Sequence, residues 1–463
     1  MEPKSTDWLG SQTIFYNTIT GKYSSKIAEV IHFEHFEWDL DGLQNFLDFG
    51  YCAFGATPIK NVKFLRPNSK LNSVNGKLVE ILDESAEQKI FSYLNRRTEP
   101  ALVIEKIIEK IQSWELSLGE DRVVLPLSGG YDSRLLASAI KNRQRLVCFT
   151  YGLSSNQSQS FEVVKAKHFA NRMGLEWHPI SLGNYHNYLD EWNKSFGVST
   201  HAHGMYHIEF YTNILQKNNA VPPHFLSGLI GDIWAGSLVV SEIKTPIQLK
   251  NLSYSHGMNA DSTCLIGRNK TNKVLEEFFE AHELKLNDPR YRVVEAIRAK
   301  IMLLKYLLEI PKTFKFKPFA PFIDQDVALS MLCLPCDERK KRKWQRDYFA
   351  KINLDIESEK LSFSRQNSLN TQALKKIPLL PLKTDILREI VKPGYVDWIN
   401  RNLLNTRISK FRHRLGILRK KNKFIRNFLP KDRHLKAYFA YLTLEPLQRL
   451  IIERDRFLRG DRK

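Results

Sequence analysis

The chain has 463 residues, more than one ordinary hydrophobic core organises, so two domains and an extension are expected. Hydrophobic residues make up 43% of it, which excludes a disordered protein, and no apolar run is long enough to span a bilayer. The formal net charge of +20 is compatible with a nucleic acid, an anionic membrane surface or an anionic substrate as partner. No apolar segment follows the first residues, and the five scattered cysteines are typical of a reduced protein, so we expect a cytoplasmic location and no membrane span.

The first hundred residues alternate short apolar runs with turn signals. A turn is predicted at residues 17–22, and a short helix at 43–49 that ends at Gly50. Residues 62–65, 71–74 and 78–82 are predicted as antiparallel strands, with Asn75-Gly76 as a hairpin turn. The charged stretch at 95–100 indicates a boundary, so residues 1–100 are expected to form a small, mainly β unit.

The hydrophobic period changes after this boundary. Residues 101–118 have apolar side chains three and four apart and are predicted as a helix. Buried strands are predicted at 122–127, 146–150 and 177–180, with helices at 132–140 and 161–172 between them. Strands that alternate with helices indicate an α/β domain, over residues 101–390, with a parallel sheet and helices on both faces. Beyond about residue 250 the pattern is mostly helical, and residues 391–463 are expected to form a basic helical extension.

The most informative segment is Ser-Gly-Gly-Tyr-Asp-Ser at residues 128–133, placed between a predicted strand and a predicted helix. Gly129 and Gly130 allow unusual backbone conformations and close approach of a ligand, and the free N–H groups of the following helix attract anions. Ser128 and Ser133 add hydroxyl donors. Asp132 would repel a bare phosphate, so its expected role is to hold a Mg²⁺ that bridges phosphate oxygens. The alternative is a plain glycine turn with a capping aspartate.

This loop resembles the pyrophosphate loop of ATP pyrophosphatases that form adenylates, a group that includes asparagine synthetase, β-lactam synthetase, argininosuccinate synthetase and tRNA-thiolating enzymes. Three further segments are similar to the asparagine synthetase family. Residues 149–178 resemble the stretch that frames adenine in the family, residues 227–237 resemble its Ser-Gly-Glu-Gly-x-Asp-Glu loop, and 321–324 with 334–335 resemble its Pro-Phe-Leu-Asp … Leu-Pro segment. The resemblance covers roughly residues 101–360 and implies an adenine-nucleotide α-hydrolase-like fold.

The resemblance implies the following site. Asp132 and Asp232 would hold Mg²⁺, and Lys343, or Arg342 under a one-residue shift, would act on the phosphates, with Asp132, Asp232 and Lys343 as catalytic residues. The ATP-binding residues would be Leu127, Ser128, Gly129, Gly130, Asp132, Ser133, Tyr151, Ser227 and Gly228.

The first hundred residues resemble the last third of the glutamine-hydrolysing domain of the same family. That domain normally begins with a processed cysteine, whereas residue 2 here is Glu2 and the first cysteine is Cys52. We therefore expect a degenerate glutaminase-like remnant that does not hydrolyse glutamine by the usual route.

The sequence departs from the family pattern where a proton acceptor is expected. The family glutamate falls on Leu229, and a second acid falls on Ile233. Amide formation needs a group that takes a proton from the attacking nitrogen, and leucine does not supply one. His203 or His207 are alternative bases, an amine nucleophile is a second possibility, and an adenylate that is never aminated is the third.

Weaker patterns leave alternatives open. Cys333 and Cys336 have metal or redox spacing but no second pair, so buried small residues are the favoured interpretation. His201, His203 and His207 lack a nearby carboxylate or cysteine set, and contact with an acceptor is the better functional interpretation. The basic tail, with Phe411, Phe424, Phe428, Tyr438 and Phe439, is explained by helices that pack on the enzyme or touch an anionic surface, without nucleic acid.

The sequence as a whole predicts an asparagine synthase-like carbon–nitrogen ligase with ATP and Mg²⁺. It would adenylate a carboxylate of a small molecule or glycan, such as aspartate or a related acid. It would then transfer ammonia or an amine to it, and a separate glutaminase is one possible source of the nitrogen. A tRNA-modifying ATP pyrophosphatase and a non-catalytic nucleotide-binding paralogue are the alternatives.

Overall fold

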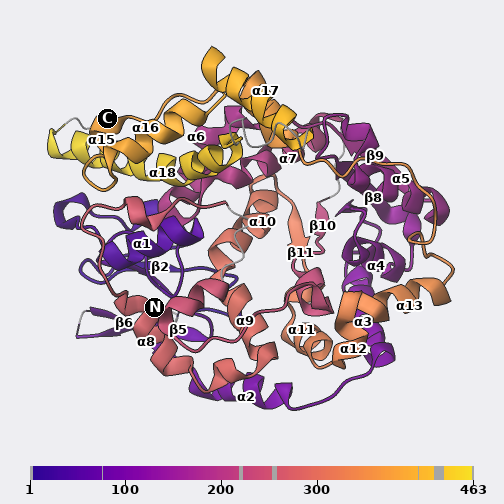
Figure 1. The fold of residues 1–463 in the computed structure, drawn as a ribbon. Helices are drawn as coiled ribbons and strands as arrows, with labels where there is room; N and C mark the ends of the chain where they lie inside the picture. The colour runs from indigo at the N-terminus through magenta and orange to yellow at the C-terminus, as the bar shows by residue number, and fades with distance from the viewer. Residues whose placement is uncertain are drawn as a thin grey trace.

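A five-stranded parallel sheet lies in the middle of the chain (Figure 1). In the computed structural model, residues 4–75, 77–217, 223–252, 258–404, 406–421 and 432–460 are described, the side chains of 417–421 excepted. The strands of the sheet are β7 (Val123–Pro126), β8 (Leu146–Tyr151), β9 (Glu176–Ile180), β10 (His224–Leu226) and β11 (Lys317–Phe319).

The order of the strands is β11-β10-β7-β8-β9, and every neighbouring pair is parallel. The chain passes from β7 outward through β8 to β9, then returns to add β10 and β11 on the other side of β7. The direction of winding therefore reverses between β7 and β10. In open α/β sheets, ligands bind at the carboxyl ends of the strands at such a reversal.

Helices cover both faces of the sheet. Alternate side chains of a strand point to opposite faces, and Val123 and Leu125 belong to one hydrophobic cluster whereas Val124 belongs to the other. The first cluster contains side chains of α3 (Pro100–Leu116), α4 (Tyr131–Ala139) and α5 (Phe161–Met173), and the second contains those of α7 (Tyr206–Lys217) and α10 (Ile301–Thr313). The predicted α/β class, the parallel sheet and its cover on both faces are confirmed.

The first ninety-five residues form two small antiparallel sheets and two helices. One sheet has the order β1-β5-β6 and the other β3-β2-β4. The elements are β1 (Lys4–Ser5), β2 (Phe15–Asn17), β3 (Tyr23–Ser24), α1 (Leu40–Phe49), β4 (Val62–Phe64), β5 (Ser69–Val74), β6 (Lys77–Leu82) and α2 (Glu84–Leu94). Gly50 ends α1 with a φ of 80°, as expected for a left-handed cap. The expected hairpin turn includes Gly76, which lies outside the described residues.

The rest of the chain is mostly helical, as predicted. The remaining helices are α6 (Leu189–Phe196), α8 (Lys273–His282), α9 (Pro289–Ala299), α11 (Gln325–Leu332), α12 (Cys336–Arg339), α13 (Lys343–Lys351), α14 (Leu369–Lys376), α15 (Thr384–Leu387), α16 (Pro393–Asn402), α17 (Arg407–Lys421) and α18 (His434–Leu458). None of the helices in the described parts of the chain has the length and apolar character that crossing a bilayer requires.

The last helix, α18, is packed against the body of the protein. Tyr438, Leu442 and Leu447 are fully buried, and the helix lies beside α16 at the edge of the molecule (Figure 1). Packing on the rest of the protein therefore accounts for this part of the basic tail. Phe424 and Phe428, which were considered with it, lie outside the described residues.

Candidate functional site

The loop between β7 and α4 is closed by hydrogen bonds between its two serines. The backbone N–H of Ser128 donates to Ser133 Oγ at 2.9 Å, and the two hydroxyl oxygens lie 3.0 Å apart. The N–H of Gly130 donates to Ser128 Oγ at 3.2 Å. The loop is thus a tight ring at the carboxyl end of the central strand.

The two glycines of this loop do not adopt the unusual backbone conformations that the sequence suggested. Gly130 has a φ of −81°, and Gly129 is likewise outside the left-handed region, so neither conformation requires glycine. A Cβ atom on Gly129 would lie 3.0 Å from Lys165 Cβ and 3.2 Å from the ring of Phe161. Gly129 is therefore needed for close packing against α5 rather than for an unusual backbone angle.

The N-terminus of α4 is open toward this loop. No side chain caps the helix, so its first N–H groups remain available to an anion. Arg134, which is fully buried, donates from Nε to the carbonyl of Gly130 at 3.2 Å and pairs with Glu357 at 2.6 Å. Lys165 also pairs with Glu357. These contacts fix the loop from behind and leave its outer side open.

A second loop follows β10, the strand next to β7, and comes close to the first. Ser227 lies at its start, where its N–H donates to the carbonyl of Phe319 at 2.8 Å. A Cβ atom on Gly231 would lie 3.0 Å from Asp132 Cγ, and one on Gly228 would lie 3.6 Å from Asp132 Cβ. Residues 227–237 are the segment that resembles the Ser-Gly-Glu-Gly-x-Asp-Glu loop in sequence. The fold places this segment against Asp132.

The second loop is held in an unusual conformation. Ile230 has a φ of 57°, which is rare for a β-branched residue and costs about 1–3 kcal/mol unless the surroundings impose it. Directly after it, Asp232 accepts a hydrogen bond from Ser237 Oγ at 2.9 Å, where a π-helical turn, η8 (Ile233–Ser237), begins. The loop therefore holds the carboxylate of Asp232 in one place.

The negative charge of Asp132 is only partly balanced by its neighbours. Gln345 Nε2 donates to its Oδ1 at 3.1 Å, and Arg342 lies 3.5 Å from its Oδ2. Burial raises the pKa of Asp132 to about 6, Arg342 opposes this rise, and the negative charge of Asp232 adds to it. Two carboxylates that repel each other across a shared space, with few hydrogen-bond donors between them, are suited to a divalent cation with oxygen ligands.

The structure separates the two candidate cations that the sequence left open. Lys343 Nζ pairs with Glu338 at 2.9 Å and with Asp347 at 2.8 Å, and these pairs occupy it on the surface of α13. Arg342 is the residue that contacts Asp132. It has a φ of 54° and follows Lys341 with a φ of 51°, and this bend turns its side chain toward the loop.

One charged residue beside Asp232 was missed from sequence. Lys300 is 3% exposed, at the junction of α9 and α10, and burial lowers its pKa to about 7 while Asp232 raises it. The sequence did contain a signal. Lys300 stands between apolar residues on both sides, and a lysine is rarely buried among apolar residues unless its charge is paired. Gln345, the donor to Asp132, had no such signal.

A cavity of about 260 Å³ opens at the carboxyl ends of β7, β8 and β10. It is mainly apolar, and the predicted residues Leu127, Ser128, Tyr151 and Ser227 all line it. Leu229 lines it as well. The cavity therefore lies where the winding of the sheet changes direction between β7 and β10. It brings together residues from three separate segments that were predicted from the sequence to bind ATP.

The histidines near this cavity are buried. His207 lines it, no hydrogen-bond partner of its Nε2 is found among the described residues, and burial together with His203 lowers its pKa to about 3. Burial likewise lowers the pKa of His201 to about 3, and its Nδ1 accepts from the N–H of His203 at 3.1 Å. His207 thus faces the cavity as a neutral imidazole, whereas His201 is a packed residue behind it.

The other candidate metal residues are placed elsewhere. Cys333 is buried and Cys336 is exposed, and they form no disulfide. His413, Asp432 and His434 lie together between α17 and α18, with ligand atoms within 4.8 Å of one another. Both ring nitrogens of His434 already have partners, Asp432 at 2.5 Å and Thr371 at 2.8 Å, so this group is complete as a structural link.

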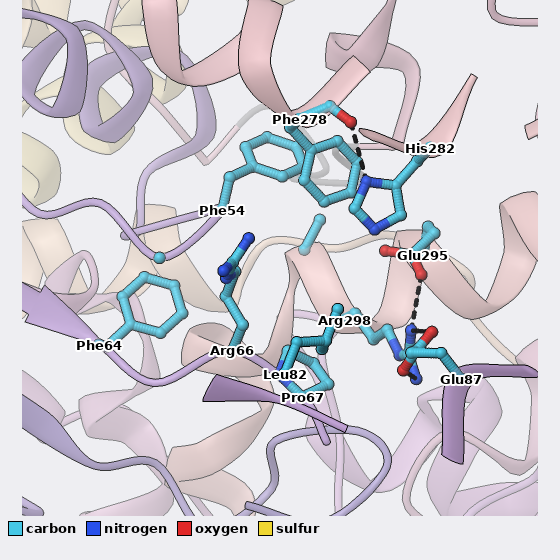
Figure 2. A pocket seen from close by; sticks show the side chains of 12 residues that line it. Phe54, Phe64, Arg66, Pro67, Leu82, Glu87, Phe278, His282, Glu295 and Arg298 are labelled. Carbon is cyan, nitrogen blue, oxygen red and sulfur yellow. Dashed lines mark hydrogen bonds and ion pairs between the residues drawn. The ribbon is translucent and has the colours of Figure 1, made fainter. Parts of the chain in front are cut away.

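A second, much smaller cavity lies between the N-terminal sheets and α9 (Figure 2). Its volume is about 40 Å³, too small for a nucleotide. Figure 2 shows Arg298 beside the carboxylates of Glu87 and Glu295, each 2.8 Å from a guanidinium nitrogen. The three side chains are at most 5% exposed. Both carboxylates make ion pairs with this one guanidinium, so each already has a hydrogen-bond donor within the cluster.

The chain has no significant match to any protein-family model or to any curated protein.

Proposed function

We propose that the chain is an ATP-dependent carbon–nitrogen ligase of the asparagine synthetase type. The observation that carries the proposal is the meeting of two loops, residues 127–133 and 227–232, at the reversal of a parallel sheet, with Asp132 of one loop packed against the glycines of the other. An open helix N-terminus and a mainly apolar cavity lie beside this contact. This combination suits a nucleotide with its phosphates on the loop and its base in the cavity.

The residues present fit a magnesium ion. Asp132 and Asp232 would hold it, and when bound it neutralises phosphate charge. The N–H groups at the start of α4 and the guanidinium of Arg342 would orient the phosphates and stabilise charge on departing pyrophosphate. Arg134 would keep the loop in position through Gly130.

The proposed reaction has two steps. A carboxylate oxygen of the acceptor attacks the α-phosphorus of ATP, the bond from that phosphorus to the β-phosphate oxygen breaks, and pyrophosphate leaves. A nitrogen nucleophile then attacks the acyl carbon, the carbon–oxygen bond to AMP breaks, and the nitrogen loses a proton. Leu229 cannot accept this proton, whereas Glu162 and His207, which also line the cavity, are the side chains there that could.

The acceptor is proposed to be a carboxylate other than aspartate. A site for a small acidic amino acid would be expected to present a cation to the side-chain carboxylate, and no lysine or arginine is among the described residues that line the cavity beside the loop. The first hundred residues are proposed to be the glutaminase-like remnant, so the nitrogen would come from free ammonia, an amine or a separate glutaminase.

A pyrophosphate-release assay tests this proposal. Purified protein is supplied with ATP, Mg²⁺, ammonia and a panel of carboxylic acids that includes aspartate and uronic acids. We expect pyrophosphate release that depends on one class of acid and no asparagine by mass spectrometry. Asparagine formation at a steady rate would contradict the choice of acceptor. Binding of tRNA, with no pyrophosphate released on any of these acids, would favour the RNA-modifying alternative.

A further inference from the structure

A groove of about 900 Å³ lies on a surface away from the ATP cavity. Four segments form it: residues 95–97 before α3, 236–240 after the second loop, 289–293 in α9, and 333–341 around α12. Its lining residues are shared neither with the cavity beside Ser128 nor with the small cavity beside Arg298. It is large enough to enclose much of a drug-sized molecule.

The groove collects cations that have no acidic partner. Within the described part of the chain, Arg96, Arg97, Arg339, Lys340 and Lys341 take part in no ion pair. A sixth lining residue, Arg290, is by contrast held by Asp288 at 2.7 Å. Several unmatched positive charges around one concave surface create a potential that attracts an anion.

Arg339 is the innermost of these cations. Its Nε is buried without a hydrogen-bond partner among the described residues, and its one hydrogen bond, to the carbonyl of Leu332, is long at 3.5 Å. Burial lowers the pKa of Arg339, and the nearby charge of Arg290 lowers it further. The backbone here is fixed, because Gly236 approaches so closely that a Cβ atom would lie 2.4 Å from the Arg339 carbonyl oxygen. A partly buried guanidinium left in this state is stabilised by an anionic ligand.

The floor of the groove is apolar. Leu238, Val240, Val293 and Leu334 line it, and Val239 is 88% exposed beside them. No aromatic side chain is among the lining residues, so the groove lacks the stacking surface with which proteins bind single-stranded nucleic acid. The combination of an apolar floor and a cationic rim matches a ligand that has both characters.

We propose that this groove binds an amphipathic anion, a molecule with an apolar body and a carboxylate or phosphate head. The head would pair with Arg339 and the rim cations Arg96 and Arg97, and the body would cover the apolar floor. This proposal does not depend on the ATP chemistry, although residues 339–342 run directly from the groove to the Arg342 side chain beside Asp132.

Cys336 offers a direct test, because it lines the groove and is the one exposed cysteine of the five. Its alkylation by N-ethylmaleimide is followed by mass spectrometry, with the full chain and with four probes below their micelle-forming concentrations: laurate, dodecyl phosphate, dodecanol and inorganic phosphate. At a concentration of about ten times Kd, the effective anion should slow alkylation roughly tenfold, because only the unoccupied protein reacts. Comparison of laurate with dodecyl phosphate identifies the head group.

The variant Arg97→Gln/Arg339→Gln should lose this protection, whereas Lys70→Gln, an exposed lysine on β5, should keep it. Alkylation without any probe shows whether the variant is folded. In the folded protein Cys336 reacts and the four buried cysteines stay unreactive. Equal protection by dodecanol, protection by inorganic phosphate alone, or unchanged protection in the double variant would each overturn the proposal.

Discussion

Among the described residues, the carboxylates beside Arg298 and the carboxylate beside Arg342 differ in how well their oxygens are matched by hydrogen-bond donors. At Arg298, two carboxylates meet one guanidinium that makes four hydrogen bonds, one of them to the carbonyl of Trp8 at 2.9 Å. Burial alone would raise the pKa of Glu87, but the charge and hydrogen bond of Arg298, together with Asn68 and Lys285, lower it overall. At Asp132 burial prevails, and the pKa rises to about 6.

The difference indicates what each place is for. The hydrogen-bonded ion pairs of Arg298 with Glu87 and Glu295 (Figure 2), and its hydrogen bond to the carbonyl of Trp8, connect α2, α9 and the N-terminal turn, so this cluster holds parts of the fold together. The unmatched Asp132 is held by the structure in a state that a bound cation would relieve. Strain at Ile230, Lys341 and Arg342 lies around the second place. Perturbed groups and strained backbone gather at functional sites more than at structural ones.

The largest expected effect comes from breaking the matched cluster. Arg298→Met should lower the free energy of unfolding by about 3–5 kcal/mol, because it leaves Glu87 and Glu295 buried without their cation. Lys312→Met, which removes an exposed pair with Glu309, should change it by less than about 1 kcal/mol. Denaturant unfolding of both variants measures the contrast. Similar small losses would mean that the Arg298 cluster is not the link described above.

A smaller effect, with a defined pH dependence, is expected at Asp132. Its folded pKa of about 6 exceeds its ordinary value of 3.8, so its stabilising contribution is complete below pH 3.8 and is lost as the pH rises through 6. Without Mg²⁺, Asp132→Asn should therefore be more stable than the wild type at pH 8 by about 3 kcal/mol, and the advantage should vanish near pH 4.

Melting temperatures of both proteins across this pH range measure the effect. The exposed Asp385→Asn serves as control and should follow the wild type. A constant difference between wild type and Asp132→Asn at all pH values would contradict the unmatched state of Asp132.

The smallest of these effects separates Arg342 from Lys343. Arg342→Ala should reduce the rate of pyrophosphate release at least about tenfold, since a cation on the phosphates contributes on the order of 1–3 kcal/mol. Lys343→Ala should leave this rate nearly unchanged, because Glu338 and Asp347 hold its ammonium group. Steady-state kinetics with ATP varied gives both values, and the opposite ranking would restore Lys343 as the phosphate ligand.

Sequence patterns predicted the central sheet well. Strands β7 and β8 follow from buried apolar runs, β9 follows from its place after the next helix, and the loop at Ser128 follows from its composition. Strands β10 and β11 are three residues each, too short to show a period. The pairing of β10 with β7, and of β11 with β10, depends on contacts between residues about a hundred positions apart.

The surroundings of Asp132 were harder to predict. Asp232 was identified by its loop, but Gln345 reaches Asp132 from α13, more than two hundred residues away, and nothing in its neighbourhood marks it. The choice between Arg342 and Lys343 depended on two left-handed residues, Lys341 and Arg342, whose conformation is unusual for lysine and arginine. Local propensity gives no indication of such a bend.

Calorimetric titration with ATP and Mg²⁺ tests the central claim, that the loop at Ser128 and the carboxylates of Asp132 and Asp232 form a nucleotide site. The wild type should bind ATP in a Mg²⁺-dependent manner, and Asp132→Ala should weaken binding by about 100-fold, the loss typical of a removed metal ligand. Cys336→Ala, outside the ATP cavity, should bind as the wild type does. Equal affinities for the wild type and Asp132→Ala would contradict the account.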